Sequence, residues 1–231
     1  FLLSILYFVS AISVLFLKHE GRPVPGERKS PMAETADGLR YVMNSPIVGG
    51  LILLSILPFL FGLTINTLLP AFSTDVLQGG PDDLGFLMTG MGGGAILGSL
   101  ALAKMGNVRN KGYWLIATGA LWGLMVSLFA LSETFVTATF CIALIGFISA
   151  VNMSMNRSLV QLQVEQHMRG RIMSIDMMSH GLMPLGVLPI GYIAETVSIS
   201  AGLVTSGIIL CLSTLLLGTL MPKVRAINIG Y

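Results

Sequence analysis

Charged side chains are scarce in this sequence of 231 residues. Asp, Glu, Lys and Arg together make up 10% of the chain, whereas hydrophobic residues make up 54% and the mean hydropathy is +0.83. A soluble globular domain is about 25% charged, because its surface must interact with water. The scarcity of charge excludes an ordinary soluble domain and indicates that a lipid bilayer is the solvent of this chain.

Motifs of catalysis and cofactor binding are missing as well. The sequence contains no GxxxxGK[ST] phosphate-binding loop, no HExxH metal motif and no carboxylate pair suited to acid–base chemistry. Its two cysteines, Cys141 and Cys211, lie inside apolar runs and are interpreted as small hydrophobic residues. The basic residues are spread over separate loops, which gives no support to nucleic-acid binding. We therefore expect no enzyme, no metal, no cofactor and no nucleic-acid partner.

Long apolar runs dominate what remains. A membrane crossing needs roughly 20 apolar residues at ~1.5 Å per residue, and these runs lack the two-residue alternation of a barrel strand. Spans without water must satisfy their backbone internally, so the runs are predicted to be helices. The fold class is an all-α polytopic membrane protein with a short first run and six full spans at residues 47–72, 84–103, 113–131, 135 to about 155, 172–194 and 199–221.

The spans divide the chain into four parts. Residues 1–17 are read as the end of a helix, and 18–45 as a linker with a short amphipathic surface helix, for which Ser30 is the N-cap and Pro31 the first helical residue. Residues 46–221 form a six-helix transmembrane half, and 222–231 form a tail. Because the sequence starts inside a hydrophobic run without an initiator Met, we expect that an upstream portion is missing.

The basic residues alternate strictly along this topology. All 13 Lys and Arg residues lie in the linker, the tail and every second loop, whereas the other loops carry only acidic residues among their charges. Positively charged loops stay in the cytoplasm. The pattern predicts a multi-pass protein of the cell (inner or plasma) membrane with a cytoplasmic linker and tail.

Four segments resemble a known family. Residues 98–112 (GSLALAKMGNVRNKG) resemble the glycine-then-basic cytoplasmic turn that follows the second helix of each half of a major facilitator superfamily (MFS) transporter. The segments NRSLVQ, RGRIMS and GLMPLGVLPIG resemble its drug- and siderophore-exporting branch, of the enterobactin-exporter and macrolide-efflux type; they occupy residues 156–161, 169–174 and 181–191. The chain departs from this branch at Glu165 and Gln166, where a Pro–acid pair is usual, and at Asp176 and His180, where aromatic residues are common.

The resemblance covers essentially the whole chain and implies the C-terminal half of an MFS fold with the end of the preceding helix. Such proteins rock two six-helix halves about a midplane site. The expected function is secondary active transport, as proton-coupled efflux of an amphipathic small molecule, with the missing N-terminal half as a partner. The alternative is a non-transporting or truncated membrane subunit. By the same resemblance, helices seven, eight, ten and eleven line the path, while nine and twelve face lipid.

Polar residues inside the spans are candidates for the substrate or proton path. Asp176 and His180 are four residues apart, hence on one helix face, and counting from Arg171 places them about 7 and 13 Å inward. A charge within the membrane is costly and marks a functional site by default, and histidine changes its charge near physiological pH. For this pair, proton coupling, a polar cavity lining and an interhelical hydrogen bond are all open. The amides Asn66, Asn152 and Asn156 could either form interhelical hydrogen bonds that hold the bundle together or recognise the substrate.

Two further groups are candidates for moving parts. The resemblance implies cytoplasmic contacts at Arg109 and Lys111, and we hypothesise that Arg169 and Arg171 complete an inner gate with them; simple positive-inside anchoring is the alternative. Glycines at four-residue spacing allow close helix packing or a sliding seam between the halves; these are Gly90, Gly94 and Gly98. Prolines within a helix give a fixed kink or a hinge; these are Pro184 and Pro189. Trp122 is mid-span and is a candidate for facing lipid.

Overall fold

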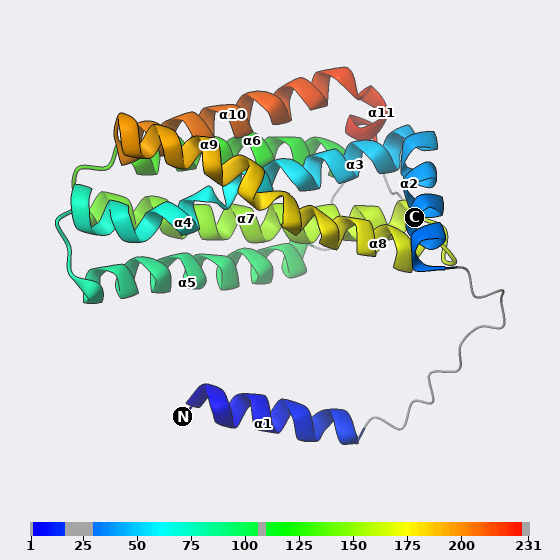
Figure 1. Ribbon diagram of the computed structural model, residues 1–231, viewed down its shortest axis with the longest axis horizontal. Helices are drawn as coiled ribbons and strands as arrows, with labels where there is room; N and C mark the ends of the chain where they lie inside the picture. Colours follow the sequence, from blue (N-terminus) through cyan, green and yellow to red (C-terminus); the bar gives the residue numbers. More distant parts are fainter. Residues whose placement is uncertain (1, 17–29, 106–109, 228–231) are drawn as a thin grey trace. The chain divides into compact units, whose positions relative to one another are not determined.

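The computed structural model describes residues 2–16, 30–105 and 110–227 (Figure 1). The chain divides into two compact units, Phe1–Pro31 and Met32–Tyr231. The described part of the first unit consists of a helix without charged residues, α1 (Leu2–Leu15), and the start of the next helix.

Helices are the regular elements of the second unit within its described residues. Six stretches are long and apolar enough to cross a membrane within the described ranges: Pro46–Val76, Pro81–Lys104, Lys111–Ala130, Phe135–Gln163, Arg169–Thr196 and Ile199–Leu220. The expected all-α class and the six spans are therefore confirmed. The elements are α2 (Pro31–Asn44), α3 (Pro46–Leu57), η1 (Pro58–Gly62), α4 (Thr64–Ala71), η2 (Phe72–Val76), α5 (Pro81–Met105), α6 (Lys111–Ala130), α7 (Phe135–Gln163), α8 (Arg169–Met178), η3 (Ser179–Leu182), α9 (Met183–Thr196), α10 (Ile199–Leu220) and α11 (Pro222–Arg225).

Three of the spans begin at a hydroxyl cap. The side chains of Ser45, Thr134 and Ser198 each accept a hydrogen bond from the backbone N–H three residues later. Such a cap satisfies one of the N–H groups that have no partner in the first turn of a helix. These local signals place the starts of α3, α7 and α10 within one residue of where the sequence predicts them.

Two spans are irregular where the sequence supplies proline. The first span changes from α-helix to a π-helical turn at Pro58, and the fifth passes through the 3₁₀ turn η3 just before Pro184. Proline lacks the N–H that would continue the hydrogen-bond ladder and its ring clashes with the preceding turn, so the chain tightens or widens there. Pro189 lies inside α9 without ending it.

Glycine sets the closest helix contacts of the bundle. A Cβ atom added at Gly94 would collide with the backbone of Ala143, and one added at Gly98 with the backbone of Phe147, so α5 lies directly against α7. In the same way α6 and α10 meet at Gly123 and Gly207. Small residues let helix backbones approach closely, and the resulting van der Waals packing is one of the forces that hold helices together in a bilayer.

Two expectations from the sequence are wrong in detail. Trp122 does not face lipid: it is fully buried, and its ring lies against Gly62 of η1. The fourth span does not end near residue 155, because α7 continues to Gln163. The polar residues after Met155 interrupt the hydrophobic run, but the helical period continues through the buried Leu159 and Val160.

Candidate functional site

Three polar side chains of α7 and α8 are buried within the bundle. Asp176, Asn152 and Asn156 are all at most 3% exposed although each lies within a membrane-spanning helix. Burying a polar group without a partner is costly, most of all in hydrocarbon. The partners of these three residues therefore decide what the site can do.

Asp176 is held by a serine of the first span. The hydroxyl of Ser55 on α3 donates a hydrogen bond to Oδ1 of Asp176 on α8, at 2.5 Å. This is a short hydrogen bond for two side-chain oxygen atoms. A buried carboxylate thus links α3 to α8, about 10 Å from the start of α8.

His180 contacts the same span one turn further on, yet its surroundings differ. Its ring lies against Phe59 with centroids 3.8 Å apart, and Nδ1 is 3.0 Å from the carbonyl oxygen of Met177. His180 is exposed and lines an open cavity of about 410 Å³ with Thr67 and Pro184. Because the chain tightens into a 3₁₀ turn at Ser179, the histidine does not follow Asp176 into the interior.

The three amides take different places. Asn152 Nδ2 donates to the carbonyl of Leu115 and to the hydroxyl of Thr118, both at 2.9 Å, and so joins α7 to α6. Asn156 Nδ2 donates to the carbonyl of Leu51 on α3 at 3.0 Å. Asn66 is exposed on α4, apart from the other two. The structure buries Asn152 and Asn156 in contacts between helices, but it does not bring Asn66 to them; the role of all three in a path stays a prediction.

A small void lies between these elements and involves a residue that the sequence analysis did not select. The void measures about 10 Å³ and is lined by Ser55, Pro58, Phe59, Asn152, Met153, Asn156 and Arg157. Arg157 is exposed and lies inside α7, about 9 Å before the end of that helix. The hydrophobic pattern alone assigns it to a loop; the helical period of Leu159 and Val160 is the signal that would have placed it within the helix.

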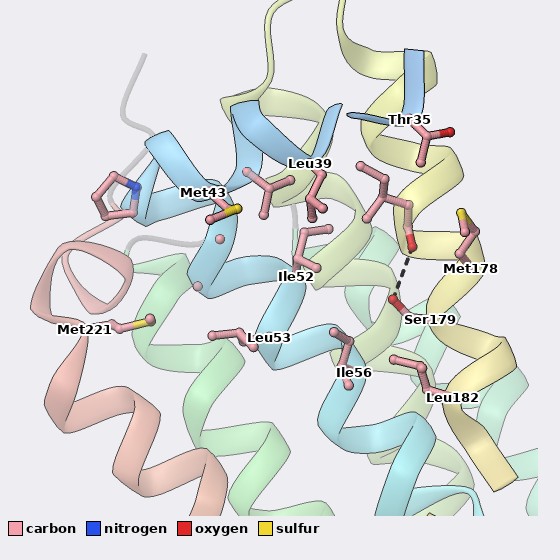
Figure 2. A pocket seen from close by; sticks show the side chains of 15 residues that line it. Thr35, Leu39, Met43, Ile52, Leu53, Ile56, Met178, Ser179, Leu182 and Met221 are labelled. Atoms are coloured by element: carbon pink, nitrogen blue, oxygen red, sulfur yellow. Dashed lines mark hydrogen bonds between the residues drawn. The ribbon is translucent and has the colours of Figure 1, made fainter. Parts of the chain in front are cut away.

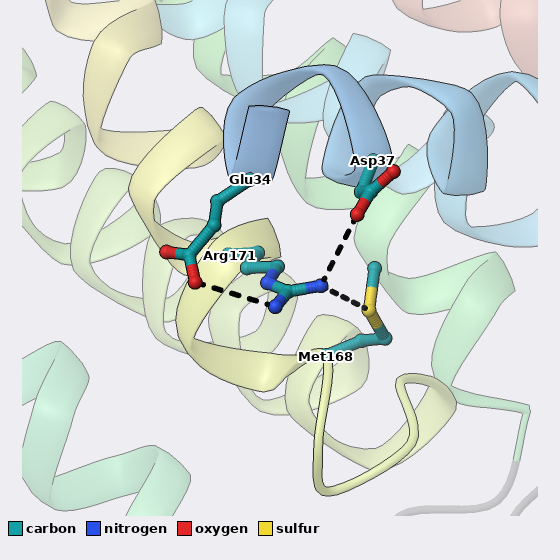
Figure 3. Close-up of polar contacts among 4 residues, drawn as sticks. All are labelled: Glu34, Asp37, Met168 and Arg171. Carbon is teal, nitrogen blue, oxygen red and sulfur yellow. Dashed lines mark hydrogen bonds and ion pairs between the residues drawn. The ribbon is translucent and has the colours of Figure 1, made fainter. Parts of the chain in front are cut away.

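The basic candidates of the gate are separated rather than clustered. Arg171 at the start of α8 forms ion pairs with Glu34 and Asp37 of α2, at 3.4 and 3.7 Å, and its Nη1 contacts the sulfur of Met168 (Figure 3). Arg169 instead donates through Nε to the carbonyl of Val164, the C-cap residue of α7, at 3.3 Å. A cation at the C-terminus of a helix complements the partial negative charge there.

The other two residues predicted for the gate are Lys111 and Arg109. Lys111 is the first residue of α6, next to Gly112, which packs against the backbone of Val224 in α11. Arg109 lies outside the described residues. The described cations therefore do not form one cluster: Arg169 and Arg171 fasten different neighbours to α8.

The glycine candidates all pack within this unit. Gly94 and Gly98 contact the backbone of α7, and a Cβ added at Gly90 would lie 3.5 Å from Thr139 of the same helix. The open face of α5 carries Gly92 and Gly93 instead, where an added Cβ would meet nothing within 4 Å. The closely packed glycines and the open ones thus occupy different sides of α5.

A larger apolar cavity lies beside the linker helix (Figure 2). It measures about 610 Å³ and is bounded by Leu39 and Met43 of α2, Ile52 and Ile56 of α3, and Met178 and Leu182 near η3. The hydroxyl of Ser179 at its edge donates to the carbonyl of Ile175 at 3.2 Å. The cavity has the volume of a drug-sized pocket. It offers almost no polar group for orientation.

The sequence of this chain is similar to a known protein family and to several curated proteins. Residues 1–229 match the transmembrane secretion effector family. Among curated proteins, the enterobactin exporters EntS of Escherichia coli O1:K1 and of E. coli O45:K1 are each 31% identical over 150 residues, and that of Shigella boydii serotype 18 is 30% identical. Each alignment covers 65% of this chain and 36% of the relative, so the matched part spans about a third of their length.

The family match extends over nearly all of the chain, and it agrees with the six helices long and apolar enough to cross a membrane. The chain is therefore a multi-pass membrane protein that belongs to the transmembrane secretion effector family of major facilitator superfamily transporters.

Proposed function

We propose that this chain is the C-terminal half of a secondary active exporter that moves an amphipathic small molecule out of the cell by alternating access. The proposal rests on the family and on the curated relatives, whose names describe them as exporters of enterobactin. Its partner is a second six-helix half. The linker and the tail lie in the cytoplasm, because every Lys and Arg residue falls on one side of the alternating topology.

The transport is coupled to protons, and the observation that carries this is the bond between Ser55 and Asp176. A buried ionisable group within a membrane span is expensive and is expected to serve function. When ionised, Asp176 accepts the serine hydroxyl and holds α8 to α3. Protonation removes the charge and weakens this bond, which frees the two spans to separate. Proton binding is thereby linked to the movement of one path-lining helix against another.

The remaining candidates take supporting places in this scheme. His180 and Asn66 are exposed and line the path, and Asn152 holds α7 against α6. Arg169 and Arg171 belong to the cytoplasmic gate, because they fasten α7 and α2 to the inner end of α8. The bend at η3 lets the outer part of this span move relative to the inner part.

The test is transport by the assembled two-half protein in inside-out vesicles with an imposed pH gradient. Asp176→Asn keeps the shape of the side chain but cannot release a proton, so gradient-driven accumulation should fall at least about tenfold, as typical of the loss of an acid–base group. Exchange of substrate without a gradient should persist. Glu195→Gln, at an exposed acid near the end of α9, is the matched control and should leave both activities unchanged.

Unaltered gradient-driven accumulation in Asp176→Asn would remove the proton role from this carboxylate. Absence of any transport by the assembled wild-type protein would favour the alternative function, a non-transporting membrane subunit.

A further inference from the structure

The open cavity beside η3 has an imidazole and a thioether in its wall. His180 and Met183 both line this cavity of about 410 Å³, and the described residues of its wall include no carboxylate. Imidazole and thioether groups are ligands of soft metal ions such as Cu(I), whereas hard cations prefer carboxylate and carbonyl oxygen atoms. The side chains of this wall are therefore those of a soft-metal site.

The ring of His180 is oriented as in a metal ligand. Its Nδ1 is 3.0 Å from the carbonyl oxygen of Met177. A carbonyl oxygen can only accept a hydrogen bond, so Nδ1 carries the proton of the neutral ring and Nε2 carries the lone pair. Phe59 lies against the ring, with centroids 3.8 Å apart, and limits its rotation. Histidines that bind metals almost always donate their second N–H to a carbonyl, a carboxylate or water in this way.

The 3₁₀ turn aligns the sulfur ligands with this ring. His180 lies within η3, and Met183 is the C-cap of that turn. Side chains three positions apart eclipse one another in a 3₁₀ helix, so Met183 follows His180 on one side of the chain. Met177 stands three positions before His180, a neighbour on the helix surface, and is 66% exposed. Its flexible, unbranched side chain is long enough to bring a third ligand to the imidazole.

The surroundings of the ligands favour an ion of low charge. No carboxylate among the described residues of the wall compensates a bound cation. Asp176, the acid four residues before His180, is 2% exposed and already bonded to Ser55. A charge that is removed from water without a counter-charge is costly, and this cost rises steeply with the charge of the ion. A monovalent cation therefore fits better than a divalent one.

We propose that His180 and Met183, with Met177 as a third ligand, bind a soft monovalent cation, Cu(I) or Ag(I). The imidazole supplies Nε2 and the methionines supply sulfur. The three residues belong to η3, α9 and α8, so a bound ion joins the two sides of the turn. The expectation of no metal rested on missing motifs such as HExxH, and thioether ligands need no such motif. The site goes beyond the proposed export and depends on neither its substrate nor its coupling.

The experiment is a titration of the assembled two-half protein with Ag(I), in detergent and chloride-free buffer. The methionine methyl groups carry ¹³C and are followed by NMR, and methionine-to-leucine variants assign the signals. The signals of Met183 and Met177 should shift and saturate at about one equivalent of Ag(I), because ligation withdraws electrons from the sulfur beside each methyl group. The signal of Met178 should stay in place, since this residue lines the other cavity (Figure 2).

Substitutions then test each ligand. His180→Phe removes the ligand nitrogen but keeps an aromatic ring beside Phe59, and it should weaken Ag(I) binding at least about tenfold, since even the loss of an outer-shell partner costs 10–100-fold. Met183→Leu nearly conserves volume and should have the same effect. Met178→Leu is the matched control and should bind Ag(I) as the wild type does. The remaining methionine signals report whether each variant is folded.

Unchanged Ag(I) affinity in a folded His180→Phe variant, or a Met183 signal that does not move, would overturn the site. Tighter binding of Zn(II) than of Ag(I) in the same titration would overturn its assignment to a soft monovalent ion. Because no step of this experiment measures transport, failure of the proposed export would leave the site standing.

Discussion

The contact of α5 with α7 and the contact of α3 with α8 follow opposite rules. Between α5 and α7, Gly94 and Gly98 bring the two backbones together without polar side chains. Between α3 and α8, a serine hydroxyl meets a buried carboxylate, and both spans change helix type within a few residues of this bond. Backbone packing of small residues has one close arrangement, whereas a charged hydrogen bond depends on protonation. Under the proposed function, the first contact would serve as a frame and the second as the place where the two spans move apart.

The largest effect should come from filling the glycine contact. Gly94→Leu places its side chain into the backbone of Ala143, where nothing flexible can yield. Overpacking costs about 1–3 kcal/mol or more, and here it should lower the folded yield in the membrane severely. Gly92→Leu is the matched control, because an added Cβ there meets nothing within 4 Å. Size-exclusion profiles and thermal melts of the two variants compare them; equal behaviour would mean that the contact does not frame the bundle.

Removing the donor to the buried carboxylate should have an intermediate effect. Ser55→Ala removes the hydroxyl that donates to Asp176, and an unsatisfied buried group costs about 1–3 kcal/mol. The double variant Ser55→Ala/Asp176→Leu should regain most of this loss, because no buried acceptor remains. A double-mutant cycle on thermal melts measures the coupling.

Ser174→Ala serves as the control for this cycle. Its hydroxyl bonds to the carbonyl of Gly170 within α8 itself and is exposed, so its loss should change stability by less than about 0.5 kcal/mol. Additive effects of the two substitutions at Ser55 and Asp176 would contradict the role of this bond in holding α3 to α8.

The smallest effect should come from the ion pairs that dock α2. Arg171 is 29% exposed, and its pairs with Glu34 and Asp37 are 3.4 and 3.7 Å long. Ion pairs this exposed contribute about 0.2–1 kcal/mol and weaken with salt. Arg171→Gln should therefore speed hydrogen exchange of the α2 amides a few-fold at low salt and hardly at all at high salt. Arg40→Gln, an exposed cation of α2 itself, is the control; the same change in both variants would show that the docking does not depend on Arg171.

The sequence predicted the spans well because a membrane helix can be recognised from its local hydropathy alone. Each needs only a run of apolar residues of the right length, and caps such as Ser45 and Thr134 mark where the run begins. The end of α7 was missed because that signal fails near the water boundary, where polar residues and helix coexist. Within the candidate site, the sequence singled out Asp176, Asn152 and Asn156 because polar groups in apolar runs are rare enough to stand out; the structure buries all three, and their place in a path stays a prediction.

What the sequence by itself determined is the solvent of this chain and the number and order of its spans, because these follow from hydropathy and from the placement of charge. Only the tertiary structure decided that Asp176 meets Ser55 across 121 positions of the sequence, that Trp122 is buried, and that Arg157 and Asn156 line one void. A side chain's partner depends on how helices rotate and cross, and that is set by the glycine contacts between them rather than by the spacing of residues along any one helix.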